Sequence, residues 1–181
     1  FNKSNTYFSH GDLCFSNMVL SEDKGSITFI DPRGGKGDEA YRTPYYDIAK
    51  LSHSLNGGYD FIINNIAKIH FDNKMQASID FNGALENNNH ELFKNFTNSL
   101  RYDMTIVRLV EASLFASMLP LHTDDEKKVF MLAIRASEIL TLLSKKGIWV
   151  SLKIIDYLFI FFGSLLLFLF SSLGWMEENF I

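Results

Sequence analysis

The chain has 181 residues, of which 47% are hydrophobic, so it is long and apolar enough to form a domain with a core. Its net charge is −4, and with acidic side chains in excess we expect no nucleic-acid partner. The single cysteine, Cys14, excludes an internal disulfide and is typical of a reducing compartment, so a cytoplasmic location is expected.

The first motif is His10-Gly11-Asp12, and Asn17 follows Asp12 after four intervening residues. This is the spacing of the kinase catalytic loop, in which the Asp accepts the proton of an attacking hydroxyl and the Asn holds Mg²⁺. We therefore predict that Asp12 is catalytic and that Asn17 is a metal ligand. His10 is expected to hydrogen-bond the loop backbone rather than act as a base. In the plainer interpretation, Asp12, Asn17 and the later Asp31 are turn residues that flank strands.

A β-hairpin is predicted directly after this motif. The apolar runs 18–20 and 27–30 flank a polar segment that ends in glycine, which is a typical hairpin pattern. A hairpin brings its two ends together, so Asp31 should lie beside Asp12 and Asn17. Three oxygen-bearing side chains would then converge, as a hard cation such as Mg²⁺ requires. Asp31 is therefore the second predicted metal ligand.

A helix is predicted over 47–56, where apolar residues recur at spacings of three and four and glycines follow. It starts within the block Tyr-Tyr-Asp-Ile-Ala-Lys-Leu at 45–51, in which Asp47 stands just before the apolar positions. An acidic residue at this place often caps the helix that it begins. A helix cap is therefore one interpretation of Asp47.

The three blocks together resemble the aminoglycoside phosphotransferase and choline kinase-like family, relatives of the protein kinases. In that family His-Gly-Asp opens the catalytic loop, an Ile-Asp strand end matches Ile30-Asp31, and a Tyr-x-Asp-Ile-Ala helix start matches 45–49. The resemblance implies that Asp47 braces the catalytic loop. It extends to about Leu143, and it departs from the family's pattern by one extra residue between Asp31 and the glycine that follows it.

The resemblance also implies a fold and an activity. The fold would be α+β and mainly helical: the C-terminal lobe of a protein kinase-like phosphotransferase, with a small β-hairpin and a hydrophobic C-terminal helix. The activity would be Mg²⁺-dependent phosphoryl transfer from ATP, or another nucleoside triphosphate, to a hydroxyl of a small molecule such as a sugar, an amino alcohol or a surface-polysaccharide precursor. No phosphate-gripping glycine motif occurs in the sequence, so we expect an N-terminal lobe of the same protein as a partner and no activity from this chain alone.

Two other functions remain open. One is a non-catalytic, membrane-tethered kinase-like module, which the lack of a nucleotide-gripping motif favours. The other is a metal-dependent phosphohydrolase with His10, Asp12 and Asp31 as ligands, which requires the His10 ring to face the metal.

The remaining elements are predicted mainly from apolar spacing. They are a helix over 59–71, a short strand pair over 74–83, a surface turn over 82–98, a helix from Ser99 to Pro120, a capping box from Thr123 to Glu126, and a helix through Leu143. Arg108 and Glu111, in the first long helix, are expected at solvated positions. Cys14, between apolar neighbours, is expected to be a buried packing residue and not a nucleophile.

The last part of the chain has a different composition. Residues 157–176 carry no charge, and this is the length of a bilayer-spanning helix. Lysines precede the stretch and glutamates follow it, so its N-terminal side should face the cytoplasm. We therefore divide the chain into a kinase-like lobe, 1–147, and a hydrophobic tail, 148–181, that anchors the lobe to the inner face of the membrane. The alternative is an extra helix packed on the lobe.

Overall fold

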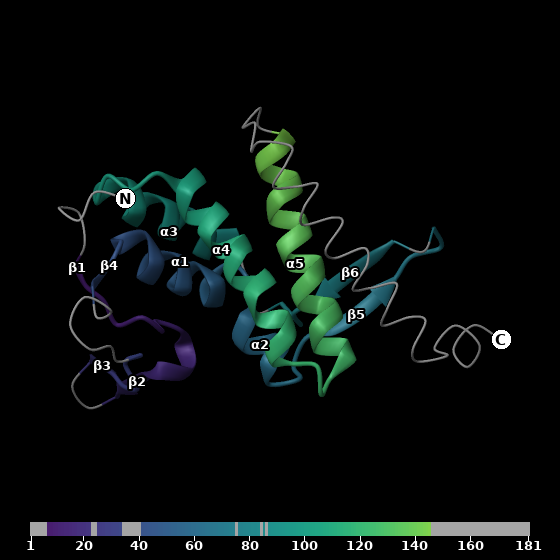
Figure 1. Ribbon diagram of the computed structural model, residues 1–181, viewed down its shortest axis with the longest axis horizontal. Coiled ribbons are helices and arrows are strands. Elements are labelled where there is room, and N and C mark those ends of the chain that lie inside the picture. Colours follow the sequence, from purple (N-terminus) through teal and green to yellow (C-terminus); the bar gives the residue numbers. More distant parts are fainter. Residues whose placement is uncertain are drawn as a thin grey trace. The chain divides into compact units, whose positions relative to one another are not determined.

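The computed structural model describes residues 7–22, 25–33, 41–74, 76–83, 85 and 87–145, without the side chains of 87 and 88. The chain forms two compact units, Phe1–Leu142 and Leu143–Ile181, and only the first three residues of the second unit are described. The described part is α+β and mainly helical (Figure 1), which confirms the predicted fold class at this level. The hydrophobic tail, including 157–176, lies outside the described residues, so the membrane anchor and the cytoplasmic location stay predictions.

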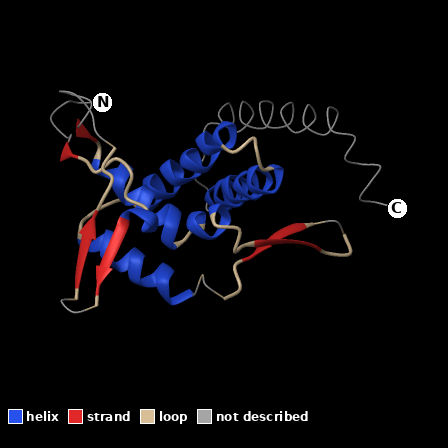
Figure 2. Cartoon of the chain, turned by 90° about the horizontal axis from the view of Figure 1, so that it is seen from below, coloured by secondary structure: helices blue, strands red, loops and turns tan. Residues whose placement is uncertain are grey.

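Helices make up most of the described part, and the strands form separate antiparallel pairs (red in Figure 2). The helices are α1 (Pro44–Leu55), α2 (Tyr59–Ile63), α3 (Asn87–Ser99), α4 (Met104–Met118) and α5 (Glu126–Lys145), with short 3₁₀ turns at Phe15–Asn17 and Leu119–Leu121. The strand pairs are β1 (Tyr7–Phe8) with β4 (Tyr41–Arg42), β2 (Met18–Ser21) with β3 (Ser26–Phe29), and β5 (Lys68–Phe71) with β6 (Ala77–Asp80).

The core forms where α1 lies along α4, with α3 packed beside both (Figure 1). Ala49 of α1 is fully buried here with Val107 and Leu114 of α4 and Phe93 of α3. The small side chain of Ala49 lets the two helix backbones approach closely. Each fully buried large apolar side chain contributes about 1.5–3 kcal/mol to stability. Helix α5 buries its own apolar stripe, in which successive members lie one to four residues apart: Val129, Met131, Leu132, Ala136, Ile139 and Leu143.

The hairpin predicted after the first motif is confirmed. β2 pairs with β3 in antiparallel register, with Met18 opposite Phe29 and Ser21 opposite Ser26. The predicted helix over 47–56 is also present, although it begins three residues earlier. Pro44 occupies its first turn, where a missing backbone N–H costs nothing.

The helix predicted over 59–71 is wrong beyond its first turn. Helix α2 ends at Ile63, and Asn65 adopts a left-handed backbone conformation with φ of 59°. Asn tolerates that conformation better than most residues, so Asn64-Asn65 turns the chain instead of continuing the helix. Residues 68–71 of the segment form strand β5, which pairs with β6. The strand pair predicted over 74–83 is therefore wrong in part, because only β6 lies within that range.

The surface turn predicted over 82–98 is also wrong, because most of this Asn-rich segment is helix α3. The helix has a buried side at Phe93 and Thr97, which are four residues apart and 3% and 0% exposed. Packing of that side outweighs the weak helix propensity of asparagine.

The starts of the two long helices differ from the predictions. Helix α4 begins at Met104 and not at Ser99, because Arg101 is left-handed and Asp103 caps the helix by accepting a hydrogen bond from Thr105 N at 2.7 Å. Helix α5 is capped by Asp125, whose Oδ1 accepts from the backbone N–H of Lys127 and of Lys128, rather than by Thr123.

Among the described residues, one helical stretch, Met104–Leu121, is long and apolar enough to cross a bilayer. Val107 and Phe115 within it are fully buried against the rest of the lobe. Core helices of folded domains share this length and composition, so the stretch does not distinguish an anchor from a core element.

Candidate active site

The loop at residues 9–17, called the motif loop below, is held by a carboxylate from α1. Oδ2 of Asp47 accepts hydrogen bonds from His10 N at 2.8 Å and Ser9 Oγ at 2.9 Å, and Oδ1 accepts from Gly11 N at 2.8 Å. Asp47 lies in the first turn of α1, yet its carboxylate accepts hydrogen bonds from the loop and not from its own helix. Gly11 has φ of +77°, and a Cβ there would meet Arg33 at 3.1 Å, so the loop requires glycine at this position.

The same face of α1 holds the loop at two further points. Nζ of Lys50 lies 2.7 Å from Oδ1 of Asp12, and Ser54 Oγ accepts from Phe15 N at 3.1 Å. Residues 47, 50 and 54 are spaced three and four apart, so they form one stripe along the helix.

Helix α2 supplies the next contact with the loop. Asp60 Oδ1 accepts from both the backbone N–H and the hydroxyl of Ser16. Lys50, Ser54 and Asp60 were not predicted as functional residues, because the interior of these two helices was interpreted from apolar spacing. The polar spacing of residues 47, 50 and 54 within a predicted helix was the available signal.

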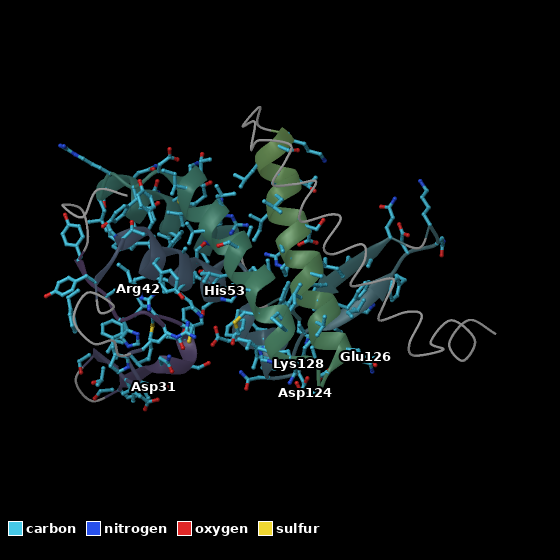
Figure 3. All side chains as sticks on the ribbon, viewed as in Figure 1. Asp31, Arg42, His53, Asp124, Glu126 and Lys128 are labelled. Carbon is cyan, nitrogen blue, oxygen red and sulfur yellow. The ribbon has the colours of Figure 1, made fainter. Side chains whose placement is uncertain are left out.

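Asn17 and Asp31 are brought to the same edge of the lobe as Asp12. Asn17 Nδ2 donates to the backbone oxygen of Asp12 at 2.9 Å, which leaves the amide oxygen of Asn17 as a potential ligand. Two backbone hydrogen bonds then bracket Asp31: Ile30 N to Asn17 O at 2.9 Å, and Arg33 N to His10 O at 2.8 Å. Asp31 therefore lies alongside the motif loop, and its side chain is exposed near the hairpin (Figure 3).

The His10 ring faces the backbone at both nitrogens. Nδ1 accepts from Asp12 N at 3.3 Å, and Nε2 lies 3.1 Å from the carbonyl oxygen of Ile30. One nitrogen must accept and the other must donate, so the contacts fit the neutral tautomer with its hydrogen on Nε2. The ring also meets Phe29 edge-on, with centroids 6.2 Å apart. A ring bound in this way has no lone pair to offer a metal.

Two of the predicted site residues carry side-chain oxygens of the kind that bind nucleotide-bound Mg²⁺. Within the described ranges, no group of three His, Cys, Asp or Glu side chains could hold a metal ion by itself. Mg²⁺ at phosphate-transfer sites needs fewer protein ligands, because one or two carboxylates and the substrate phosphates share its coordination. Asp31 and the amide oxygen of Asn17 are oxygen ligands suited to that arrangement.

Cys14 has a packing role, as predicted. It is 4% exposed, and burial raises the pKa of its thiol, with the nearby carboxylates of Asp12 and Asp60 acting in the same direction. The thiol therefore stays protonated at neutral pH and is a poor nucleophile.

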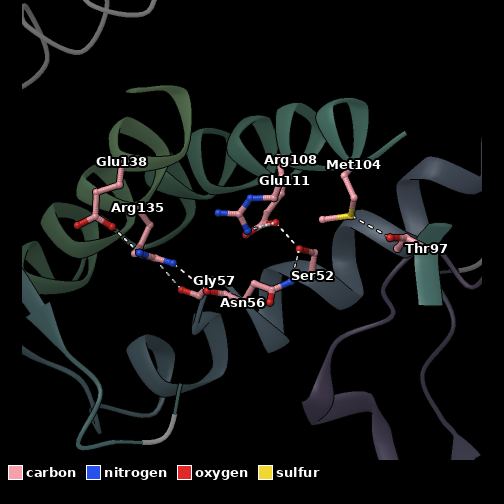
Figure 4. A network of polar contacts seen from close by, with 9 residues as sticks. All are labelled: Ser52, Asn56, Gly57, Thr97, Met104, Arg108, Glu111, Arg135 and Glu138. Carbon is pink, nitrogen blue, oxygen red and sulfur yellow. Dashed lines mark hydrogen bonds and ion pairs between the residues drawn. The ribbon is translucent and has the colours of Figure 1, made fainter. Parts of the chain in front are cut away.

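A buried polar network joins the helices on another side of α1 (Figure 4). Ser52 donates to Oε2 of Glu111, and Asn56 Nδ2 donates to the Ser52 hydroxyl at 2.9 Å. Nη1 of Arg108 contacts both carboxylate oxygens of Glu111, at 2.8 and 2.7 Å. Glu111 is fully buried, so the solvated position expected for this pair is wrong. Burial raises the pKa of Glu111 although Arg108 acts to lower it.

Arg135 of α5 closes this network at the end of α1 (Figure 4). Its Nε donates to Gly57 O at 3.0 Å and its Nη2 to Asn56 O at 2.8 Å, and it also pairs with Glu138. Gly57 permits the close packing, since a Cβ there would lie 2.6 Å from the Phe115 ring. The carbonyls left unpaired by the end of α1 are thus satisfied by a side chain from α5.

His53 lies buried among these helices (Figure 3) without a hydrogen-bond partner for either ring nitrogen among the described residues. Its ring stacks on Tyr59, with centroids 4.4 Å apart, and meets the Phe115 ring at 4.0 Å. Burial lowers its pKa well below 6.5, and the charges of Lys50 and Arg135 lower it further. His53 is therefore neutral in the folded lobe at physiological pH.

We expect His53 to make the lobe less stable as the pH falls below 6.5. Above that pH the ring is neutral both folded and unfolded, so it contributes no pH dependence. Below it the unfolded chain binds a proton that the buried ring does not accept, which costs up to about 1.4 kcal/mol per pH unit. Urea unfolding measures the free energy of unfolding at pH 7.5 and at pH 5.5. Its decrease between the two should be smaller for His53→Gln than for the wild type. His70→Gln, at an exposed histidine, is the control, and an unchanged loss in His53→Gln contradicts the prediction.

Comparisons with models of known protein families, with curated proteins and with solved structures found no match. The functional assignment of the site therefore depends on its own residues and their geometry.

Proposed function

We propose that this chain is the catalytic lobe of a kinase-like phosphotransferase. It would transfer a phosphoryl group from Mg²⁺-bound ATP, or another nucleoside triphosphate, to a hydroxyl of a small molecule. The observation that carries the proposal is the pair of backbone hydrogen bonds on either side of Asp31. They tie the end of the hairpin to the backbone of His10 and Asn17. Asp12, Asn17 and Asp31 therefore share one edge of the lobe.

Each residue has a separate role in this proposal. Asp12 orients the acceptor hydroxyl and receives its proton, while Asn17 and Asp31 hold Mg²⁺ against the phosphates. His10 and Asp47 support the loop from behind, through the backbone contacts described above. Such a site acts mainly by positioning its reactants and neutralising charge.

The proposal requires a segment that grips the nucleotide phosphates. No glycine-rich motif of that kind occurs in these 181 residues. We therefore place the phosphate-gripping loop and its lysine in another part of the same protein, and we expect the 181-residue chain alone to be inactive.

The test of the proposal is Mg²⁺-dependent nucleotide binding by the full-length protein. Asp31→Asn and Asn17→Ala should each weaken the binding of ADP in the presence of Mg²⁺ by about 10- to 100-fold, because each removes an oxygen ligand. Isothermal titration calorimetry with ADP, with and without Mg²⁺, measures this. ADP binding without Mg²⁺ should change little.

Asp124→Asn is the matched control, because it makes the same isosteric change at an exposed carboxylate before α5 (Figure 3). Wild-type affinity in both variants would rule out the metal site. No binding of Mg²⁺-ADP by the wild type would instead favour a non-catalytic module. The phosphohydrolase with His10 as a ligand is disfavoured by the backbone contacts of both ring nitrogens.

A further inference from the structure

Lys50 has an unusual environment for a lysine. It is 5% exposed, and lysine is rarely buried to this extent unless it is paired. Its Nζ lies 2.7 Å from Oδ1 of Asp12, and 5.6 Å from the centre of the Tyr59 ring. The ammonium group is thus held between an anion and an aromatic face, both of which attract a cation.

The two partners of this ion pair are exposed to different degrees. The Lys50 side chain is 6% exposed and the Asp12 side chain 34% exposed, so the lysine approaches the carboxylate from the interior. Among the described residues, the Asp12 carboxylate is contacted at Oδ1 by Lys50, and no hydrogen bond reaches Oδ2. One oxygen is therefore bound from inside the lobe, and the other is left without a partner among these residues, in a side chain that is one-third exposed.

The backbone on each side of Asp12 is already fixed. Asp47 binds the amides of His10 and Gly11, and Ser54 binds the amide of Phe15. With the backbone held, the freedom left to Asp12 is rotation of its side chain. Lys50, on the same stripe of α1, restricts that rotation.

We propose that Lys50 is the positioning residue of Asp12 and directs its second carboxylate oxygen towards the acceptor hydroxyl. This inference rests on the proposed function. In the transfer step the acceptor oxygen forms a bond to the γ-phosphorus, and the bond from that phosphorus to the bridging oxygen breaks. The nucleoside diphosphate leaves with the electron pair, and the acceptor's proton passes to Oδ2 of Asp12.

The experiment measures ADP formation from Mg²⁺-ATP by the full-length protein, with water as the acceptor. Lys50→Met nearly keeps the length of the side chain and removes its charge. ADP formation should then fall about 10- to 100-fold, the usual loss when a residue that orients an active-site group is removed. The binding of Mg²⁺-ADP should be unchanged, because Lys50 touches neither predicted metal ligand. Lys128→Met is the matched control: Lys128 also pairs with an aspartate, at 3.8 Å, and should leave the rate unchanged.

Two further variants separate positioning from packing. Lys50→Arg keeps the charge but is bulkier, so it should retain more activity than Lys50→Met, whereas a packing role predicts the reverse order. In an Asp12→Asn background, Lys50→Met should cause no further loss, because Lys50 acts through Asp12. Circular dichroism checks the fold of each variant. If Lys50→Met alone does not fold, the double variant still gives the comparison with Asp12→Asn.

The outcomes distinguish this inference from the function on which it rests. Three results each overturn the role of Lys50. They are a wild-type rate in Lys50→Met, a lower rate in Lys50→Arg than in Lys50→Met, and a loss from Lys50→Met that is as large in the Asp12→Asn background as in the wild type. Full activity in Asp12→Asn, or no ADP formation by the wild type, overturns the proposed function itself.

Discussion

Asp12→Asn in the full-length protein is expected to lower phosphoryl transfer by about 10²- to 10⁴-fold, the usual contribution of a general base. The amide cannot accept the acceptor's proton as a carboxylate does, although its shape is nearly the same. Binding of Mg²⁺-ADP should stay close to the wild-type value, because Asn17 and Asp31 hold the metal in our proposal. ADP formation and calorimetric ADP titration measure the two quantities separately.

The control for this prediction is Asp124→Asn, which removes an exposed carboxylate before α5. It should leave both the rate and the affinity unchanged. If Asp12→Asn were as active as the wild type, or if it lost Mg²⁺-ADP affinity in proportion to its rate, Asp12 would have a different role.

Glu111→Ala is expected to lower the free energy of unfolding by about 3–5 kcal/mol, the range for breaking a buried ion pair by removing one partner. The substitution leaves the mostly buried Arg108 guanidinium without its carboxylate and the Ser52 hydroxyl without its acceptor. Urea unfolding followed by circular dichroism measures the change. Glu111→Gln keeps an acceptor for Ser52 and should cost less, about 1–3 kcal/mol.

A double variant isolates the cause of this loss. Glu111→Leu with Arg108→Leu removes both charges, so it should recover much of the stability that Glu111→Ala loses. A loss below about 1 kcal/mol in Glu111→Ala would mean that water or another group compensates the charge of Arg108.

The sequence predicted the parts of the site that depend on local pattern. The hairpin follows from two apolar runs around a glycine turn, and its closure places Asp31 alongside the motif loop. The contact of Asp47 with the loop was implied by the family resemblance. The position of Asp47 in the sequence does not predict that contact, because it fits a helix cap equally well. In the structure Asp47 accepts hydrogen bonds from two backbone amides of the loop, at His10 and Gly11, and from the Ser9 hydroxyl.

The missed features depend on tertiary contacts. Arg108 and Glu111 are three residues apart on α4, and this spacing is common to solvated pairs and buried ones. The packing of α1 along α4, with Ser52 donating to Glu111, is a tertiary contact that the spacing on α4 does not contain. In the same way, the apolar residues of 59–71 fit a helix and a strand about equally, and the Asn64-Asn65 turn decided between them.

The contacts of the motif loop also determine when it can form during synthesis. Its amides at His10, Gly11, Phe15 and Ser16 donate to side chains that lie 36 to 44 residues further along the chain. A ribosome therefore releases the loop well before the helices that order it, and the loop stays unstructured until about residue 60 has emerged. The motif loop is thus among the first described segments to be translated, yet it cannot reach its native conformation before α1 and the start of α2 have been made.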